Sequence, residues 1–252
     1  MKKFLFADLD DTLFQTIGKC PQPDALEPAA YYQDGSVCSY TTRAQRSLLA
    51  LFQGGMTLIP TTARDLDGLR RVRLPLPFAS YAVIDYGGVV LEPGGAVDAP
   101  WLEGMRTAMH AALPGLQELA AHIDDHGART GYGGRARMIE DFGVPFFLVV
   151  KDPDKLAARL APLEAEVVRP WIEDGKRDYF IHRNGNNLAI LPTAQNKAHA
   201  VAHVSARLRA EHGDIVTFGM GDSRSDARFM AACDYALIPR GTQLAGLTVG
   251  AL

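Results

Sequence analysis

A short apolar run that ends in a group of carboxylates lies near the start of the chain. Residues 4–7 are apolar and are followed at once by Asp8-Leu9-Asp10-Asp11-Thr12. A run of this length is typical of a strand buried in a parallel sheet, and the acids then lie at its carboxyl end. Open α/β sheets bind ligands beyond that edge. A solvated Asp-rich turn is the alternative. Carboxylates this close repel one another, so a cation or a shared proton has to offset their charge.

Single strands alternate with helices in the first part of the chain, which is the pattern of a parallel sheet. Thr42 is placed to cap a helix, and Gly54 is placed to close it. The segment before this helix, residues 14–40, shows no periodicity and is expected to be an irregular connection. The other expected elements are strands at 4–7, 56–60 and 81–84 and a polar helix after Asp65.

The pattern changes after residue 85. A long amphipathic helix is expected at 102–123, and the strands that follow come in neighbouring groups, which is typical of an antiparallel α+β unit. The expected strands are 135–139, 146–150, 166–169, 179–183 and 188–191, with a helix at 155–163; a helix at 197–209 and a strand at 215–219 follow. We therefore predict an α/β fold. Residues 1–85 and 191–252 form a three-layer, Rossmann-like parallel-sheet core, and residues 86–190 form an inserted, smaller α+β cap domain.

Composition excludes some classes of partner. The 252 residues carry a formal net charge of -3, which gives no electrostatic case for binding nucleic acid or an anionic membrane. No stretch approaches the roughly 20 apolar residues of a membrane span. The three cysteines, Cys20, Cys38 and Cys233, form no CxxC pair, which suits a reducing compartment. We expect a cytoplasmic protein that is a monomer or a small homo-oligomer.

Polar side chains are expected at four points along the carboxyl edge of the core sheet. They are Asp8 and Asp10, then Thr62, then Lys197, and finally the segment Gly221-Asp222-Ser223-Arg224-Ser225-Asp226. Each of them alone is weak evidence, because such residues commonly cap helices or face solvent. Together they supply a complete set of groups for phosphoryl transfer.

Each group has a chemical role in that reaction. Asp8 can attack phosphorus and form an aspartyl-phosphate, and Asp10 can act as the general acid and base. Asp222, supported by Asp226, offers carboxylate ligands to Mg²⁺. The Thr62 hydroxyl and the Lys197 ammonium can bind the phosphoryl oxygens as charge develops.

The ordered set resembles the four motifs of the haloacid dehalogenase (HAD) superfamily. The matching residues are DLDDT at 8–12, Thr62, Lys197 and GDSRSD at 221–226. The resemblance implies that Asp8 is the nucleophile and a metal ligand. It implies that Asp10 is the acid/base and binds the metal through its backbone carbonyl, and that Asp222 and Asp226 complete the Mg²⁺ site. An aspartate at position 10 points to a phosphatase or phosphotransferase rather than a dehalogenase.

The insertion between the second and third motifs resembles the α/β cap of one phosphatase subgroup, which holds the sucrose-phosphate, mannosylglycerate-phosphate and trehalose-phosphate phosphatases and the Cof-type hydrolases. The chain departs from the Cof-type pattern in reading Thr62-Ala63-Arg64, with Thr61 as a rival, and Tyr86-Gly87-Gly88. These departures weaken any transfer of substrate identity. Candidate substrate-binding residues are Arg64, Asp65, Gly87, Gly88, Arg183 and Asn184.

The predicted function is therefore Mg²⁺-dependent hydrolysis of a small phosphate ester, most simply a sugar phosphate, with neither nucleic acid nor membrane as partner. Two alternatives remain open. A phosphomutase of the same superfamily would return the phosphoryl group to a sugar. A receiver-like signalling domain would accumulate phosphoaspartate, although the cap and the pair Asp222 and Asp226 would be superfluous there.

Overall fold

The computed structural model describes residues 1–20 and 25–251. The chain divides into two compact units. The first comprises Met1–Leu102 and Asn196–Leu252, and the second comprises Glu103–Gln195. Both boundaries lie later in the chain than 85/86 and 190/191, where the sequence pattern changes. The reason at the first boundary is that β6 (Val89–Leu91) pairs antiparallel with β5 (Ala82–Ile84), which keeps this segment in the first unit.

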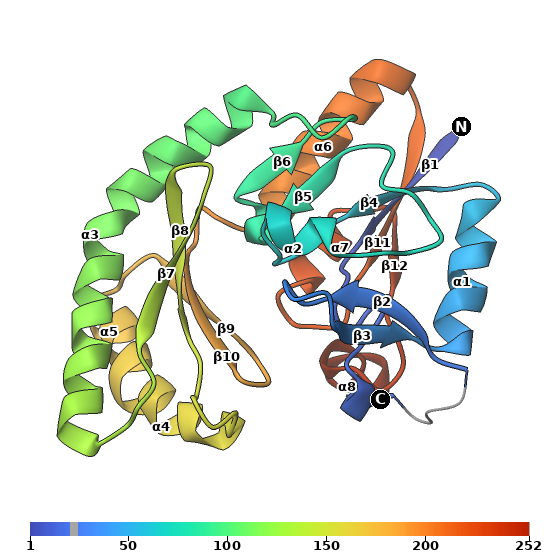
Figure 1. Cartoon of the computed structure of the whole chain (residues 1–252). Coiled ribbons are helices and arrows are strands. Elements are labelled where there is room, and N and C mark those ends of the chain that lie inside the picture. Colours follow the sequence, from blue (N-terminus) through green and yellow to red (C-terminus); the bar gives the residue numbers. More distant parts are fainter. Residues whose placement is uncertain (21–24, 252) are drawn as a thin grey trace. The chain divides into compact units, whose positions relative to one another are not determined.

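The first unit is built on a parallel sheet with the strand order β12-β11-β1-β4 (Figure 1). The strands are β1 (Lys2–Ala7), β4 (Thr57–Pro60), β11 (Ile215–Met220) and β12 (Tyr235–Leu237). A parallel bridge between Thr61 and Val83 sets β5 beside the end of β4. The last four residues of β1 are buried, as expected for a central strand. The predicted α/β class with a parallel core sheet is confirmed.

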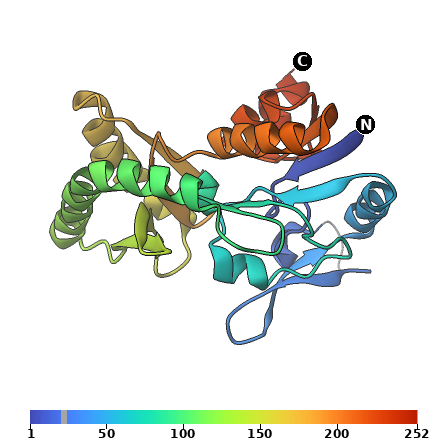
Figure 2. The ribbon, with the colours of Figure 1, turned by 90° about the horizontal axis from the view of Figure 1, so that it is seen from above.

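The helices of this unit are α1 (Arg43–Gln53), α2 (Leu66–Arg70), α6 (Lys197–His212), α7 (Ala227–Ala231) and α8 (Gln243–Leu247), with 3-10 turns at Ile17–Lys19, Asp85–Gly87 and Val249–Ala251. Thr42 caps α1 in a capping box with Gln45. Val201, Val204 and Leu208 of α6 share one apolar cluster with Phe4 and Phe6 of β1. Figure 2 shows this helix (orange) on one side of the strands of the first unit. This packing fixes the helix that begins with Lys197.

The expected irregular connection at 14–40 is wrong in part. Its second half forms an antiparallel hairpin of β2 (Glu27–Tyr31) and β3 (Val37–Thr41). Register shifts between Pro28 and Tyr31 break the two-residue alternation that normally identifies a strand. Residues 21–24 of the connection lie outside the described residues.

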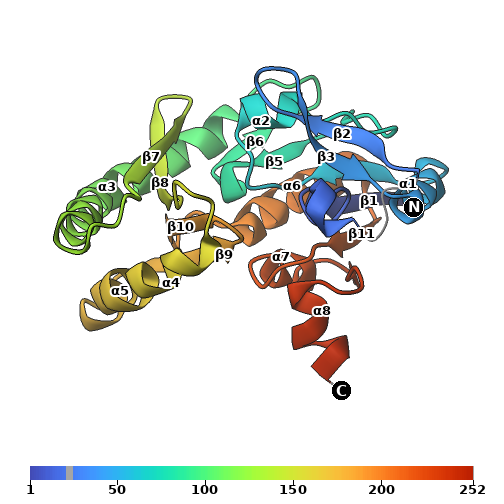
Figure 3. The same ribbon diagram turned by 60° about the horizontal axis from the view of Figure 1, so that its bottom comes forward.

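The second unit contains an antiparallel sheet with the strand order β7-β8-β10-β9. The strands are β7 (Ala136–Asp141), β8 (Val144–Val150), β9 (Tyr179–Asn184) and β10 (Asn187–Pro192). Helices α3 (Ala99–Thr130), α4 (Leu160–Leu163) and α5 (Arg169–Asp174) pack their apolar side chains with this sheet, and a 3-10 turn (Ala157–Arg159) precedes α4 (Figure 3). Helix α3 begins in the first unit. The α+β character predicted for this region agrees with the observed elements.

The strand predicted at 166–169 is wrong. Residues Glu164–Val168 form a π-helical turn that joins α4 to α5. Val167 and Val168 favour a strand by propensity, but Leu160, Leu163 and Val168 share the apolar core of the unit at helical spacing. Tertiary packing therefore overrides local propensity here. None of the described helices combines the length and apolar character needed to cross a bilayer.

Candidate active site

A buried lysine joins two carboxylates at the carboxyl edge of the core sheet. The Lys197 ammonium donates to Asp8 Oδ1 at 2.6 Å and to Asp226 Oδ1 at 2.7 Å. Asp8 follows β1 directly, and Asp226 follows the loop after β11, the strand that pairs with β1 in parallel. All three residues are nearly inaccessible, with 6% of Asp8, 1% of Asp226 and 5% of Lys197 exposed. The parallel pairing of β1 and β11 is what brings these distant segments together.

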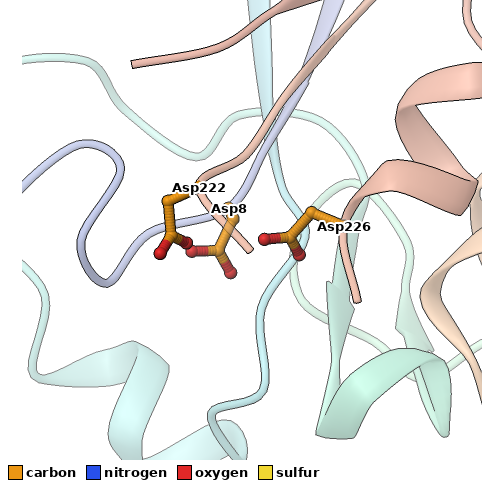
Figure 4. A group of neighbouring side chains, drawn as sticks. All are labelled: Asp8, Asp222 and Asp226. Carbon is orange, nitrogen blue, oxygen red and sulfur yellow. The ribbon is translucent and has the colours of Figure 1, made fainter. Parts of the chain in front are cut away.

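A third carboxylate, that of Asp222, completes the cluster (Figure 4). One oxygen from each of Asp8, Asp222 and Asp226 lies within 4.8 Å of the other two. The Thr12 hydroxyl lies 3.2 Å from Asp8 Oδ2 and 3.3 Å from Asp222 Oδ1, so it can donate to either. Three carboxylates therefore face one ammonium group, which leaves two negative charges if all are ionised.

The pKa values of the three carboxyl groups reflect this excess of negative charge and the burial of the cluster. Burial, together with Asp226 and Asp222, raises the pKa of Asp8 well above its ordinary value, although Lys197 opposes the shift. Burial and the neighbouring Asp226 and Asp11 raise the pKa of Asp222 to about 7. Burial alone would also raise the pKa of Asp226, but the contacts with Lys197 and Ser223 bring it below the ordinary value. Ionisation of Asp8 and Asp222 is therefore disfavoured in the cluster, and a divalent cation at this position would offset that penalty.

The donor set fits a hard divalent cation. Carboxylate oxygens are the ligands that Mg²⁺ and Ca²⁺ prefer in proteins, and two uncompensated negative charges match one such ion. The group within 4.8 Å does not include Asp10. The three carboxylates are close enough to share one ion, and metal ligation by Asp8, Asp222 and Asp226 stays a prediction. Ligation by the Asp10 backbone carbonyl stays a prediction.

Asp10 is bound by Arg64 instead. The guanidinium donates from Nε to Asp10 Oδ2 at 2.6 Å and from Nη2 to Oδ1 at 2.8 Å, a two-point contact. Arg64 is itself oriented by the Gly68 carbonyl, at 3.2 Å from Nη1, and by the Phe14 ring, 5.3 Å from the guanidinium carbon. The two hydrogen bonds fix the orientation of the Asp10 side chain, the group predicted to act as the general acid and base.

Thr62 and Thr61 are both buried at the end of β4 but differ in their contacts. The Thr62 hydroxyl accepts a hydrogen bond from the Arg64 amide at 3.2 Å. The Thr61 hydroxyl donates to the Ile59 carbonyl of β4 at 3.3 Å. Thr61 therefore points back to the strand that it follows, and Thr62 lies one residue further into the loop, where a phosphate-binding hydroxyl is expected.

The remaining predicted substrate-binding residues have other contacts. Asp65 caps α2 by accepting from the Gly68 amide at 2.6 Å. Gly87 and Gly88 lie in and after the turn that follows β5. Arg183 and Asn184 end β9 in the second unit, where the Arg183 guanidinium contacts Glu164 and the Ala157 carbonyl. Whether these residues contact a substrate stays a prediction.

Two contributions to the site were missed by the sequence analysis. Ser223 donates to Asp226 Oδ2 from both its amide and its hydroxyl, at 3.1 and 2.6 Å. The Ser-x-x-Asp spacing could have indicated this contact. Tyr86 is buried beside the cluster, and burial raises the pKa of its phenol, with Lys197 opposing and Asp8 adding to the shift. No spacing rule points to Tyr86, because its position depends on a turn with unusual dihedral angles.

Comparison with solved structures identifies similar folds. The sucrose-phosphatase from Synechocystis sp. PCC6803, solved in complex with sucrose and phosphate, has a TM-score of 0.53 at 17% identity over 98% of this chain and 86% of that one. The C-terminal domain of trehalose-6-phosphate phosphatase from C. albicans has a TM-score of 0.55 at 13% identity, over 92% and 73% of the two chains. A Thermoplasma acidophilum protein has a TM-score of 0.51 at 15% identity, over 94% and 91%. No family model and no curated protein sequence matches the chain.

Proposed function

We propose that this chain, whose fold is that of the haloacid dehalogenase superfamily phosphatases, hydrolyses phosphate monoesters of small polar molecules. One observation carries the proposal. A buried lysine holds the carboxylates of Asp8 and Asp226, with Asp222 alongside, at the carboxyl ends of adjacent parallel strands. A structural role alone gives little reason to bury three carboxylates around one ammonium, because each buried charge is costly.

In the first half-reaction, an oxygen of Asp8 attacks the phosphorus atom. The new bond between oxygen and phosphorus forms as the ester bond to the alcohol breaks, which leaves an aspartyl-phosphate. The alkoxide that leaves takes a proton from Asp10. Because Arg64 contacts both Asp10 oxygens, at least one of these contacts has to break before Asp10 can carry the proton.

In the second half-reaction, water attacks the aspartyl-phosphate. Asp10, again ionised, accepts a proton from that water, so inorganic phosphate leaves and Asp8 is restored. Lys197 and the Thr62 hydroxyl stabilise the charge that develops on the phosphoryl oxygens in both steps. Lys197 is available for this because its ammonium already lies 2.6 Å from the attacking carboxylate.

Asp8, Asp222 and Asp226 would hold Mg²⁺. The ion, when bound, neutralises the carboxylates and the incoming phosphate dianion. The raised pKa values of Asp8 and Asp222 support this assignment, because a carboxyl group that keeps its proton is a poor nucleophile and a poor ligand until a cation lowers its pKa.

The substrate is proposed to be a sugar phosphate. The support is the resemblance of the fold to sucrose- and trehalose-6-phosphate phosphatases, together with the α+β unit that this chain carries between Thr62 and Lys197. In this proposal residues 86–190, the predicted cap, select the substrate. A cytoplasmic location is consistent with three free cysteines. A monomer or small homo-oligomer stays a prediction.

The test is a phosphate-release screen over sugar, polyol and nucleotide monophosphates, with Mg²⁺ and with EDTA. We expect metal-dependent release concentrated on a few sugar phosphates and none from an Asp8→Asn variant. Acid-quenched samples would carry the phosphoryl group on the peptide containing Asp8. Accumulation of that species without turnover would favour a receiver. Isomerised sugar phosphate after addition of a bisphosphate would favour a mutase.

A further inference from the structure

The turn after β5 has an unusual backbone. Asp85, Tyr86 and Gly87 have φ angles of 50°, 54° and 95°, and all three residues are buried. Left-handed conformations at non-glycine residues cost roughly 1 to 2 kcal/mol each. Two of them in succession persist only where the surrounding structure holds them. Such strain is concentrated at functional sites, so the contacts of this turn matter.

The turn is attached to the segment that carries Thr62. The Asp85 amide donates to the Arg64 carbonyl at 2.9 Å, and the Tyr86 amide donates to the Thr62 carbonyl at 3.1 Å. A third hydrogen bond, from the Gly88 amide to the Asp85 carbonyl at 2.9 Å, closes the turn on itself. The backbone of the turn is therefore fixed with respect to Thr62.

The same turn touches the start of α6. A Cβ atom added to Gly87 would lie 2.6 Å from the Asn196 carbonyl carbon and 2.9 Å from the Lys197 amide nitrogen. No side chain fits at this position, and the φ angle also requires glycine. Asn196 caps α6, and Lys197 is the first residue of that helix. Gly87 therefore sets how closely Lys197 approaches the Thr62 segment.

Trp101 contacts Gly87 as well, at its carbonyl group. Its indole Nε1 donates to the Gly87 carbonyl at 3.2 Å, and its ring packs on that of His203 in α6, with centroids 4.8 Å apart. The Trp101 amide donates to the buried Asp98, at 3.1 Å. Asp98 in turn contacts His203 and Arg207 of α6, at 2.7 and 2.6 Å. Trp101 thus links the turn to the body of the helix that begins with Lys197.

We propose that Gly87, Trp101 and Asn196 form a clasp that positions the Lys197 ammonium between Asp8 and Asp226. Trp101 is then a positioning residue for Lys197 that makes no contact with substrate itself. The proposal rests on the function proposed above in one respect, that Lys197 acts on the phosphoryl group. It assigns to Gly87 a role in backbone packing in addition to any contact with substrate.

The first test compares two tryptophan variants. Trp101→Phe keeps an aromatic ring and removes the indole N–H. Trp171→Phe makes the same change in the second unit, where the indole N–H finds no hydrogen-bond partner among the described residues. We expect Trp101→Phe to lower kcat for a phosphate monoester about tenfold, the size of effect that one hydrogen bond supports. Trp171→Phe should leave kcat unchanged. Equal kcat values in the two variants would overturn the clasp.

A control variant tests whether a loss of kcat reflects only a loss of stability. Leu49→Ala opens a cavity under α1 in the same unit and should lower Tm without changing kcat at 25 °C. A kcat loss in Trp101→Phe that Leu49→Ala reproduces would mean that the loss reflects stability alone, and would overturn the proposal. Gly87→Ala should lower kcat on the order of 100-fold, the cost of a misplacement of about 1 Å.

The second test needs no activity. The full-length protein is treated with an amine-acylating reagent, and the peptide containing Lys197 is followed by mass spectrometry. Lys197 is buried between two carboxylates, so we expect slow acylation in the wild type, Trp171→Phe and Leu49→Ala, and acylation several-fold faster in Trp101→Phe. If the wild type released no phosphate, the proposed function would be wrong, but the acylation rates would still test the clasp. Equal acylation of all four proteins would overturn the clasp even in an active enzyme.

Discussion

Lys197 in the first unit and Arg183 in the second each bind carboxylates, but in different ways. Lys197 has a side chain that is 5% exposed, and its partners lie 189 and 29 residues away in sequence. Arg183 has a side chain that is 32% exposed, and it contacts Glu164 at 3.4 Å and the Ala157 carbonyl at 2.7 Å, 19 and 26 residues away. Lys197 binds residues that follow strands far apart in sequence. Arg183 links β9 to the helical turns that precede it in the chain.

The difference between the two ion pairs indicates a functional role for the first and a structural role for the second. A long-range, buried ion pair costs desolvation energy and is weak evidence for stability. Its retention therefore points to a functional demand. A half-exposed, local pair costs little and contributes little. Charged side chains in the second unit were harder to interpret from sequence for this reason, since most of their contacts are of the local kind.

The largest effect is expected from Asp8→Asn. Removing the nucleophile should lower kcat by at least about 10⁴-fold. Burial and the neighbouring carboxylates raise the pKa of Asp8 above that of the unfolded chain, so the folded state loses stability as pH rises through this window. Asn avoids that cost, and the free energy of unfolding at pH 7 without metal should not fall. Phosphate release and urea titration measure the two effects. Near-wild-type turnover would exclude covalent catalysis.

The second-largest effect is expected from Lys197→Ala. Loss of one charge-stabilising donor should lower kcat about 10²- to 10³-fold. The variant leaves the carboxylates of Asp8, Asp222 and Asp226 without their ammonium, so the apoprotein should lose about 3 kcal/mol of stability at pH 7. Added Mg²⁺ should restore part of this loss, because a bound cation stabilises the folded state. Thermal melts with and without Mg²⁺ measure both. An unchanged Tm would mean that the ion pair contributes nothing to the stability of the folded state.

Asp98→Asn tests an intermediate case, a buried carboxylate that contacts His203 and Arg207 of α6. Burial alone would raise the pKa of Asp98, but the hydrogen bonds from His203, Trp101 and Arg207 bring it below the ordinary value. Its stabilising effect is therefore present above about pH 4 and is lost as pH falls through the folded value. The variant should be less stable by about 2 kcal/mol at pH 7 and equal to wild type near the acid limit. A difference independent of pH would contradict this account.

Arg183→Ala should have the smallest effect. The Arg183 side chain is 32% exposed and its nitrogen lies 3.4 Å from the Glu164 carboxylate, so the expected loss of stability is only about 0.5 to 1 kcal/mol. Chemical denaturation measures this loss. If Arg183 also binds substrate, as the sequence predicts, KM should rise while kcat changes little. An unchanged KM would leave Arg183 a purely structural residue and sharpen the contrast with Lys197.

The cluster around Lys197 was predictable because most of its residues lie just beyond strand ends. Asp8, Thr62 and Asp222 come one or two residues after β1, β4 and β11, and parallel strands bring their carboxyl ends to one edge. Lys197 was predictable from its order in the motif set. The Arg64 contact with Asp10 was not, since it depends on how one long side chain is oriented by Gly68 and Phe14.

Features that depend on tertiary context were missed. The hairpin at 27–41 has irregular register, and the π-helical turn at 164–168 overrides the strand propensity of two valines. The contacts of Gly87 with Asn196 and Trp101 join residues more than a hundred positions apart or in different elements. A sequence pattern indicates which residues face a core. It does not indicate which backbone atoms meet when helices are packed on a sheet.

The pairing of β1 with β11 has a consequence for synthesis and folding. Thr12 and Asp222, which meet in the cluster, are 210 residues apart, and Asp8 and Lys197 are 189 apart. A growing chain therefore carries Asp8 and Thr12 long before their partners exist. The second unit is one continuous segment, Glu103–Gln195, and is complete earlier. Because contacts between distant residues form slowly, amides of the second unit should gain protection in pulse-labelled refolding before those of β1. Activity would then be the last property that the folding chain acquires.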